Sequence, residues 1–200
     1  RQMCIRDSSY SASFVVKKQF SDTSEEGLAF IYATEDSTLD SLHEDLFKQI
    51  SREKKGGAGN ATSNTMDILN KLPRWFVKFF IWLMRQLDRH GIVPKAIIEA
   101  DPYYASVILS NLGSIKLRSG YHHLTNWGTT SLFVVVGEMK ERIFRDEKGE
   151  DEYRNSVDLG LTIDERLADG YYYSKSVRLL KYILEHPECL EHPFSEPVDY

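Results

Sequence analysis

Short apolar segments of β-prone residues, separated by amphipathic and polar stretches, constrain the fold of this chain more than any other feature. Five such segments predict strands, at residues 13–20, 28–33, 105–109, 131–136 and 157–163. Between the last two, the charged segment RDEKGEDEYR is typical of a solvated hairpin turn. Apolar residues at helical spacing predict helices over residues 38–53 and 171–186. This mixture predicts an α/β fold, a two-layer sandwich in which helices cover a mixed sheet.

An aromatic segment, RWFVKFFIWLMRQLDRH at residues 74–90, predicts a further helix that stops at Gly91. On a helical wheel, four cations fall within an arc of about 60°, and apolar side chains cover about half of the circumference. The four are Arg74, Lys78, Arg85 and Arg89. So wide an apolar stripe is typical of a helix buried between two neighbours; contact with a membrane surface or a partner protein is the alternative. The apolar run is about half the ~20 residues that a membrane-spanning helix needs.

Composition narrows the function classes. The 200 residues carry 25 Lys and Arg against 30 Asp and Glu, a net charge of −5, which argues against nucleic acid as a partner. Two cysteines, Cys4 and Cys189, exclude a disulfide scaffold and suit a reducing, cytoplasmic compartment. Because RQMCIRDS resembles translated sequencing-adapter sequence, we expect residues 1–8 to be an artefact or a disordered start. Residues 9–200 are then one domain that lacks its true N-terminus.

Several motif fragments fail as sites. His43-Glu44 begins like a zinc-protease helix, but position 47 is phenylalanine rather than the second histidine. Three residues of the C-terminal tail have metal-like spacing among prolines, and no metal site is expected there: His186, Cys189 and His192. The adjacent histidines at residues 122–123 fall in a predicted loop and are expected to be solvated rather than catalytic.

The segment TIDERLADGYYYSKSVRLLKYILEHPE, at residues 162–188, stands out because a strand passes through charged residues directly into a helix. Such a corner holds reactive groups still between two rigid elements. Four ionisable residues crowd it: Asp164, Glu165, Arg166 and Asp169. The simplest structural interpretation is an ion pair between Arg166 and Asp169 that pins the turn.

This corner resembles the HxxxDG motif in the catalytic domain of 2-oxo acid dehydrogenase dihydrolipoyl acyltransferases, above all short bacterial members, and more distantly chloramphenicol acetyltransferase. The matching residues run from Glu165 to Gly170. ILSNLG at residues 108–113 is similar to the family's strand ending in serine and a [ST]-x-L-G turn. GLAFIYATEDSTLDSLHEDLFKQI and SLFVVVGEMKER resemble two further strands with their neighbouring segments. The matches cover most of residues 13–190 in order and imply a chloramphenicol acetyltransferase-like fold.

The resemblance implies a reaction in which an acyl group moves between coenzyme A and a lipoyl-type thiol or a hydroxyl acceptor. In the family a histidine takes the proton from the attacking thiol and a serine stabilises the oxyanion. By correspondence Ser110 holds the oxyanion, Asp169 braces the corner through a salt bridge, and Glu165 stands where the family has its histidine. The family also implies a homotrimer with its active sites between subunits, and a lipoyl group that is not on this chain.

Two departures from the family matter. An ordinary carboxylate is about four pKa units less basic than a thiolate, so the glutamate either needs a special environment or makes the protein inactive. The alternative function is therefore a catalytically inactive relative that acts as an oligomeric assembly or regulatory module. The second departure is a helical insertion at about residues 60–100, which contains the aromatic segment. If that segment is not buried, the insertion is expected to contact a membrane surface or a partner protein.

Overall fold

The computed structural model describes residues 10–17, 26–34, 36–54, 71–146 and 148–191. Its centre is a five-stranded sheet in the order β2-β1-β3-β4-β5. The strands are β1 (Tyr10–Lys17), β2 (Glu26–Ala33), β3 (Val107–Asn111), β4 (Leu132–Arg145) and β5 (Asp151–Ile163). The three central strands are parallel to one another, and β2 and β5 pair antiparallel at the two edges. The predicted mixed sheet is confirmed.

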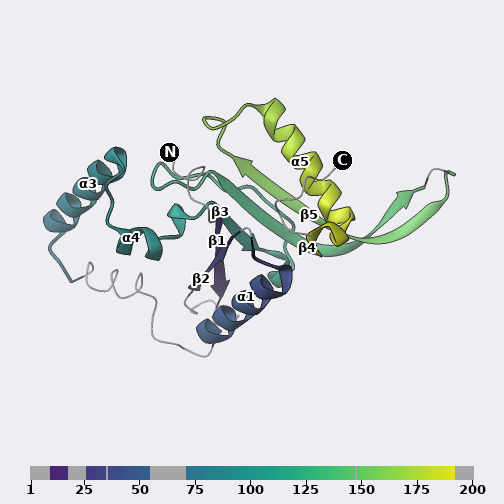
Figure 1. Ribbon diagram of the computed structural model, residues 1–200, viewed down its shortest axis with the longest axis horizontal. Coiled ribbons are helices and arrows are strands. Elements are labelled where there is room, and N and C mark those ends of the chain that lie inside the picture. The colour runs from purple at the N-terminus through teal and green to yellow at the C-terminus, as the bar shows by residue number, and fades with distance from the viewer. Residues whose placement is uncertain (1–9, 18–25, 35, 55–70, 147, 192–200) are drawn as a thin grey trace.

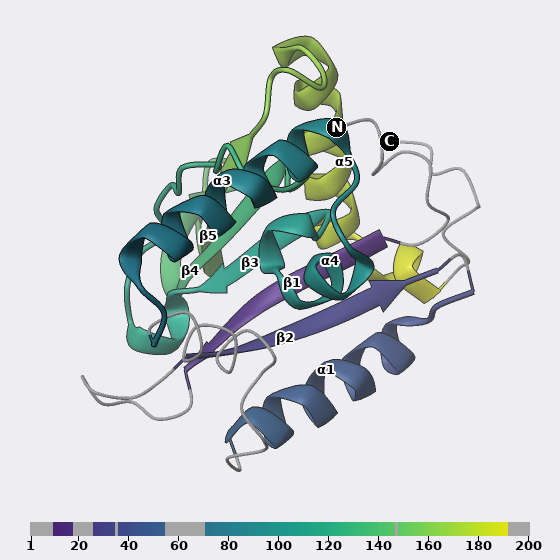
Figure 2. The ribbon, with the colours of Figure 1, turned by 90° about the vertical axis from the view of Figure 1, so that its left-hand side faces the viewer.

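Among the described residues, four α-helices accompany the sheet: α1 (Leu39–Lys54), α3 (Arg74–His90), α4 (Lys95–Ala100) and α5 (Gly170–Glu185). Helix α1 lies along β2 in both views (Figures 1 and 2). The amide of Gln49 on α1 accepts a hydrogen bond from Phe30 N (2.8 Å) and donates one to Phe30 O. These bonds occupy backbone groups that an edge strand otherwise exposes. The α/β class is confirmed.

The buried core is small and lies mostly on and around strands β1 to β4, with Val93 in the connection between α3 and α4. Its apolar members include Val16, Ala105, Ile108 and Val135. The hydroxyl of the buried Thr130 donates to Ala105 O (2.8 Å), which ties the segment before β4 to the segment before β3. The centre of the sheet is therefore a rigid frame for whatever lies at its ends.

The hairpin between β4 and β5 is much longer than predicted. Half of the segment expected to be a solvated turn is strand, and the turn is confined to residues 146–150, where Gly149 N donates to Asp146 O (3.0 Å). Beyond the irregularity between Val136 and Met139, the two strands form an arm that projects from the sheet, here called the hairpin arm (residues 139–157; Figure 1). Most of its side chains are exposed on both faces, so it lacks the apolar alternation by which a strand is predicted.

The aromatic helix α3 contradicts the prediction that it is buried between two neighbours. None of its residues is buried, and Trp75 is 71% exposed. The helix lies at the margin of the molecule, away from the sheet (Figure 1). No helix in the described part of the chain combines the length and apolarity needed to cross a membrane. Residues 1–8 and the first part of the predicted insertion, residues 60–70, lie outside the described residues.

Candidate active site

The corner between β5 and α5 is held by backbone bonds around a buried aspartate. Asp164 follows the last residue of β5, and its N–H donates to Ser131 O (2.9 Å) just before β4. Its carbonyl accepts from Leu167 N (3.0 Å), which closes the turn. The side chain of Asp164 is 7% exposed. The corner is therefore fixed to the sheet rather than suspended in solvent.

The ion pair of this corner is not the predicted one. Arg166 Nε donates to Asp164 Oδ1 (2.7 Å) and an Arg166 terminal nitrogen donates to Asp164 Oδ2 (2.6 Å), a bidentate pair. These hydrogen bonds raise the pKa of the Arg166 guanidinium. Asp169 instead accepts a hydrogen bond from Tyr172 N (2.9 Å) and caps α5. The expected salt bridge of Asp169 with Arg166 was wrong because Asp164 presents both oxygens to that guanidinium.

The first turn of α5 is tied back to the same aspartate. The phenol of Tyr173 donates to Asp164 O (3.0 Å). Burial raises the pKa of Tyr173, and electrostatic interactions with Asp164, Tyr172 and Glu165 raise it further. The carboxylate of Glu165 thus lies within electrostatic range of this phenol, on the exposed side of the corner. Its exposure leaves it open to a molecule that docks there.

Ser110 lies half-buried at the end of β3, where the chain turns back across the sheet. The turn is built by close backbone contact: a Cβ at Gly113 would lie 2.5 Å from Gly137 O, and one at Gly160 would lie 2.0 Å from Gly120 O. Leu112 N donates to Val136 O (2.9 Å), so the turn is also bonded to β4. The glycine of the [ST]-x-L-G pattern is required because the chain rests directly on the next strand.

Ser110 and Glu165 do not meet within one chain. Ser110 pairs with Val135 on β4, and Val135 pairs with Gly160 on β5, three residues before the end of that strand. Two strand spacings across and three residues along place Ser110 roughly 14 Å from Ile163, and Glu165 lies farther on. The corner and the hairpin arm stand at opposite ends of β5 (Figure 1). A catalytic group must lie about 3 Å from the substrate atom on which it acts. One copy therefore does not bring both residues into contact with the same substrate. Glu165 and Asp169 do share the corner.

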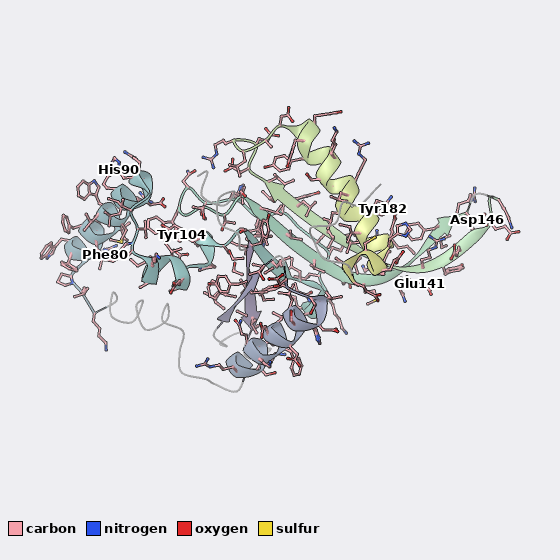
Figure 3. All side chains as sticks on the ribbon, viewed as in Figure 1. Phe80, His90, Tyr104, Glu141, Asp146 and Tyr182 are labelled. Atoms are coloured by element: carbon pink, nitrogen blue, oxygen red, sulfur yellow. The ribbon has the colours of Figure 1, made fainter. Side chains whose placement is uncertain are left out.

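A cavity of about 670 Å³ lies between the C-terminal half of α3 and residues 125–129. Its wall includes Arg85, Asp88 and Arg89 of α3, with Tyr104 and Trp127 opposite. Figure 3 shows Tyr104 between α3 and the sheet. Burial and the hydrogen bond to Asp88 raise the pKa of Tyr104, so its phenol keeps its proton. Sequence reasoning missed this cavity because its walls come from segments whose proximity only the tertiary structure creates.

No cluster of three or more His, Cys, Asp or Glu side chains within the described ranges is arranged to hold a metal ion. Of the tail residues with metal-like spacing, His186 contacts Glu188 (3.3 Å) and His192 lies outside the described residues. His122 is exposed, and its ring stacks on Phe133 of β4 with centroids 4.5 Å apart. The imidazole is thus placed by contact with the sheet, which its position in a polar loop did not indicate.

Three solved structures are similar to the described architecture over almost the whole chain. A probable dihydrolipoamide acetyltransferase from Listeria monocytogenes matches 97% of this chain with a TM-score of 0.57 and 13% identity. The cubic core of a pyruvate dehydrogenase multienzyme complex matches 92%, with a TM-score of 0.56 and 12% identity. The dihydrolipoamide acetyltransferase of Azotobacter vinelandii, studied for the catalytic roles of a serine, a histidine and an asparagine, matches 92%, with a TM-score of 0.54 and 13% identity. The fold is that of the dihydrolipoamide acetyltransferases.

This acetyltransferase fold confirms the architecture that the sequence resemblance implied. The chain spans 57–61% of the length of these three chains. No protein-family model and no curated protein matches the sequence. The likeness is therefore one of three-dimensional arrangement, and the chemistry has to be argued from the residues of this chain.

Proposed function

We propose that the chain is an acyltransferase domain that moves an acyl group between a coenzyme A thioester and an acceptor, either a lipoyl-type thiol or a hydroxyl. The observation that carries the proposal is the corner at residues 164–170. There a buried, fully bonded Asp164 and a helix-capping Asp169 hold an exposed Glu165 between two rigid elements. The corner occurs in a chain whose fold is that of known acetyltransferases.

In the proposed reaction, Glu165 is the general base. Its carboxylate takes the proton of the attacking thiol, and the thiolate forms a bond to the thioester carbonyl carbon. The hydroxyl of Ser110 donates a hydrogen bond to the resulting oxyanion. When the intermediate collapses, the carbon–sulfur bond to coenzyme A breaks and the proton passes from Glu165 to the leaving thiolate. Arg166 stays bound to Asp164 throughout and acts as a positioning residue.

A homotrimer completes the proposed site, with Ser110 of one copy facing Glu165 of the next. The separation of the two residues within one chain supports this arrangement. So does apolar surface left exposed on two parts of the chain: Tyr171 and Tyr172 beside the corner, and Met139, Ile143 and Tyr153 on the hairpin arm, which extends beyond the part of β4 that pairs with β3. Contact between different surfaces of neighbouring copies closes into a ring when the rotation allows it. Burial in such an interface would also exclude water from the carboxylate.

The test uses purified full chain with acetyl-coenzyme A and dihydrolipoamide. Glu165→Gln is expected to lower kcat about 100-fold or more, and Ser110→Ala about 100-fold, because base and oxyanion donor are removed in turn. Glu191→Gln, an exposed carboxyl away from the corner, is the control and should leave turnover unchanged. Unchanged turnover in both site variants would contradict these roles.

A second candidate is a non-catalytic oligomeric assembly or regulatory module. It is favoured by the replacement of the family's imidazole with a carboxylate that is exposed in the single chain. Coenzyme A binding by wild-type protein with no acyl transfer to either acceptor would support it, and robust transfer would exclude it. For either function we propose a reducing, cytoplasmic setting, which suits the free thiol of Cys189.

The N-terminal half of α3 is proposed to contact an anionic membrane surface. Trp75, Phe79 and Trp82 are all more than half exposed and lie beside cationic side chains of the same helix. Trp75→Asp combined with Phe79→Asp is expected to reduce co-sedimentation with phosphatidylglycerol-containing vesicles at least 10-fold. Tyr121→Asp alters an exposed aromatic ring elsewhere and should have no effect. Wild-type protein that stays in the supernatant would indicate a protein partner or none.

A further inference from the structure

Two arginines on α3 line the cavity beside the sheet. Arg85 and Arg89 are one helical turn apart, so both guanidinium groups project from the same face. Within the described ranges neither makes an ion pair, whereas the carboxylate between them, Asp88, accepts the hydroxyl of Tyr104 (2.9 Å). The cavity lining thus carries two cations against the one carboxylate of Asp88, a positive surplus in a chain with a net charge of −5.

The opposite wall of the cavity is aromatic and held in place. Trp127 and Tyr104 meet edge to face with ring centroids 5.8 Å apart. The indole N–H of Trp127 donates to Asp101 Oδ2 (2.6 Å), which fixes the ring orientation. Gly128 packs directly on the backbone of Tyr103, where a Cβ would lie 2.1 Å from the carbonyl oxygen. The wall is therefore preformed, as small-molecule sites usually are.

We propose that this cavity binds the phosphorylated nucleotide end of the coenzyme A thioester. Guanidinium groups bind phosphate through paired, charge-assisted hydrogen bonds, and aromatic rings stack on purine bases. The cavity volume of about 670 Å³ falls within the range of small-molecule sites. The inference rests on the proposed function only in taking coenzyme A as the acyl donor.

The position of the cavity suits a donor whose thioester must reach the corner. Thr129 lines the cavity, and Ser131, two residues later, accepts the backbone bond from Asp164. The proposed nucleotide site and the β5–α5 corner thus lie at the two ends of one short segment, residues 129–131. A pantetheine arm extending along this segment would bring the thioester toward the corner, where Glu165 is exposed.

The experiment measures binding of adenosine 3′,5′-bisphosphate to the full chain by calorimetry, with inorganic phosphate and phosphate-free pantetheine as comparison probes. Arg85→Gln with Arg89→Gln is expected to weaken bisphosphate binding at least 10-fold. Arg74→Gln with Lys78→Gln removes the same charge from the same helix, away from the cavity, and should change the affinity less than 2-fold. Trp127→Leu should weaken binding of the bisphosphate but leave the affinity for inorganic phosphate unchanged, because only the adenine base stacks on the indole.

Absence of bisphosphate binding to the wild type would overturn the inference. Equal losses of bisphosphate affinity in the two double variants would also overturn it, because they would indicate a general attraction between charges. Its failure is separable from that of the proposed function. If Glu165→Gln loses turnover while Arg85→Gln with Arg89→Gln keeps the KM for acetyl-coenzyme A, the cavity assignment is wrong and the function stands. If the wild type transfers no acyl group but loses bisphosphate affinity through the two cavity arginines, the cavity assignment stands alone.

Discussion

Mixing equal amounts of the Ser110→Ala and Glu165→Gln variants should restore up to about a quarter of wild-type acyl transfer, although each variant alone is nearly inactive. The reason is the sheet register, which keeps the two residues too far apart within one chain to act on the same substrate. If each site takes its serine from one copy and its glutamate from the next, random assembly pairs an intact serine with an intact glutamate at about one interface in four. The measurement is turnover after joint unfolding and refolding of the mixture.

The control is a mixture of Ser110→Ala with the Ser110→Ala, Glu165→Gln double variant, in which no interface has an intact serine. It should remain inactive. Recovery in the first mixture and none in the control supports a site shared between copies. Activity of either single variant near that of wild type, or no recovery after confirmed co-assembly, contradicts the shared site.

Gly160→Ala should be strongly destabilising. A Cβ at this position would lie 2.0 Å from Gly120 O, and the Gly160 backbone cannot move away without disturbing the β4–β5 pairing. We expect a loss of about 3 kcal/mol in the free energy of unfolding, since overpacking against backbone is among the costlier substitutions. For a chain of this size that corresponds to a Tm lower by roughly 6–12 °C.

Gly170→Ala provides the matched comparison. Gly170 is the first residue of α5, its φ is not positive, and no atom lies within 4 Å of an added Cβ. Alanine there should leave stability unchanged or raise it by about 0.5 kcal/mol, because it restricts the unfolded chain. Calorimetric melting of both variants checks the pair. If the Gly160→Ala protein had the same Tm as the wild type, the segment after β3 would not rest on β5.

The sequence predicted the parts of the fold whose periodicity reflects burial. Strands β1 and β3 and helix α1 were placed within a few residues because their apolar side chains face the core. The length of the hairpin arm was underestimated because both of its faces are exposed and carry charged side chains. Glu141 and Asp146 lie along it in Figure 3. The aromatic helix α3 was wrongly predicted in the opposite direction, since its apolar stripe predicts full burial and the described residues leave each of its residues at least partly exposed.

The candidate site was predictable in its residues but not in its contacts. A strand-to-helix corner rich in charge was evident, and the structure places Glu165 and Asp169 there. Whether Arg166 pairs with Asp164 or with Asp169 depends on the directions of these side chains, which their spacing in the sequence does not determine. The distance from Ser110 to the corner depends on the order and register of strands far apart in sequence, so only the structure gives it.

The pairing of β1 with β3 has a consequence for how the chain folds. Ala12 lies opposite Val107, so the central pair joins segments that are 95 residues apart, with α1, α3 and α4 between them. Loop-closure entropy grows only slowly with length, by about 0.6 kcal/mol for each doubling, so a long intervening segment is tolerated at equilibrium. Its effect is kinetic, because pairings between distant segments form slowly. Shortening the segment between α1 and α4 is therefore expected to accelerate folding far more than it stabilises the native state.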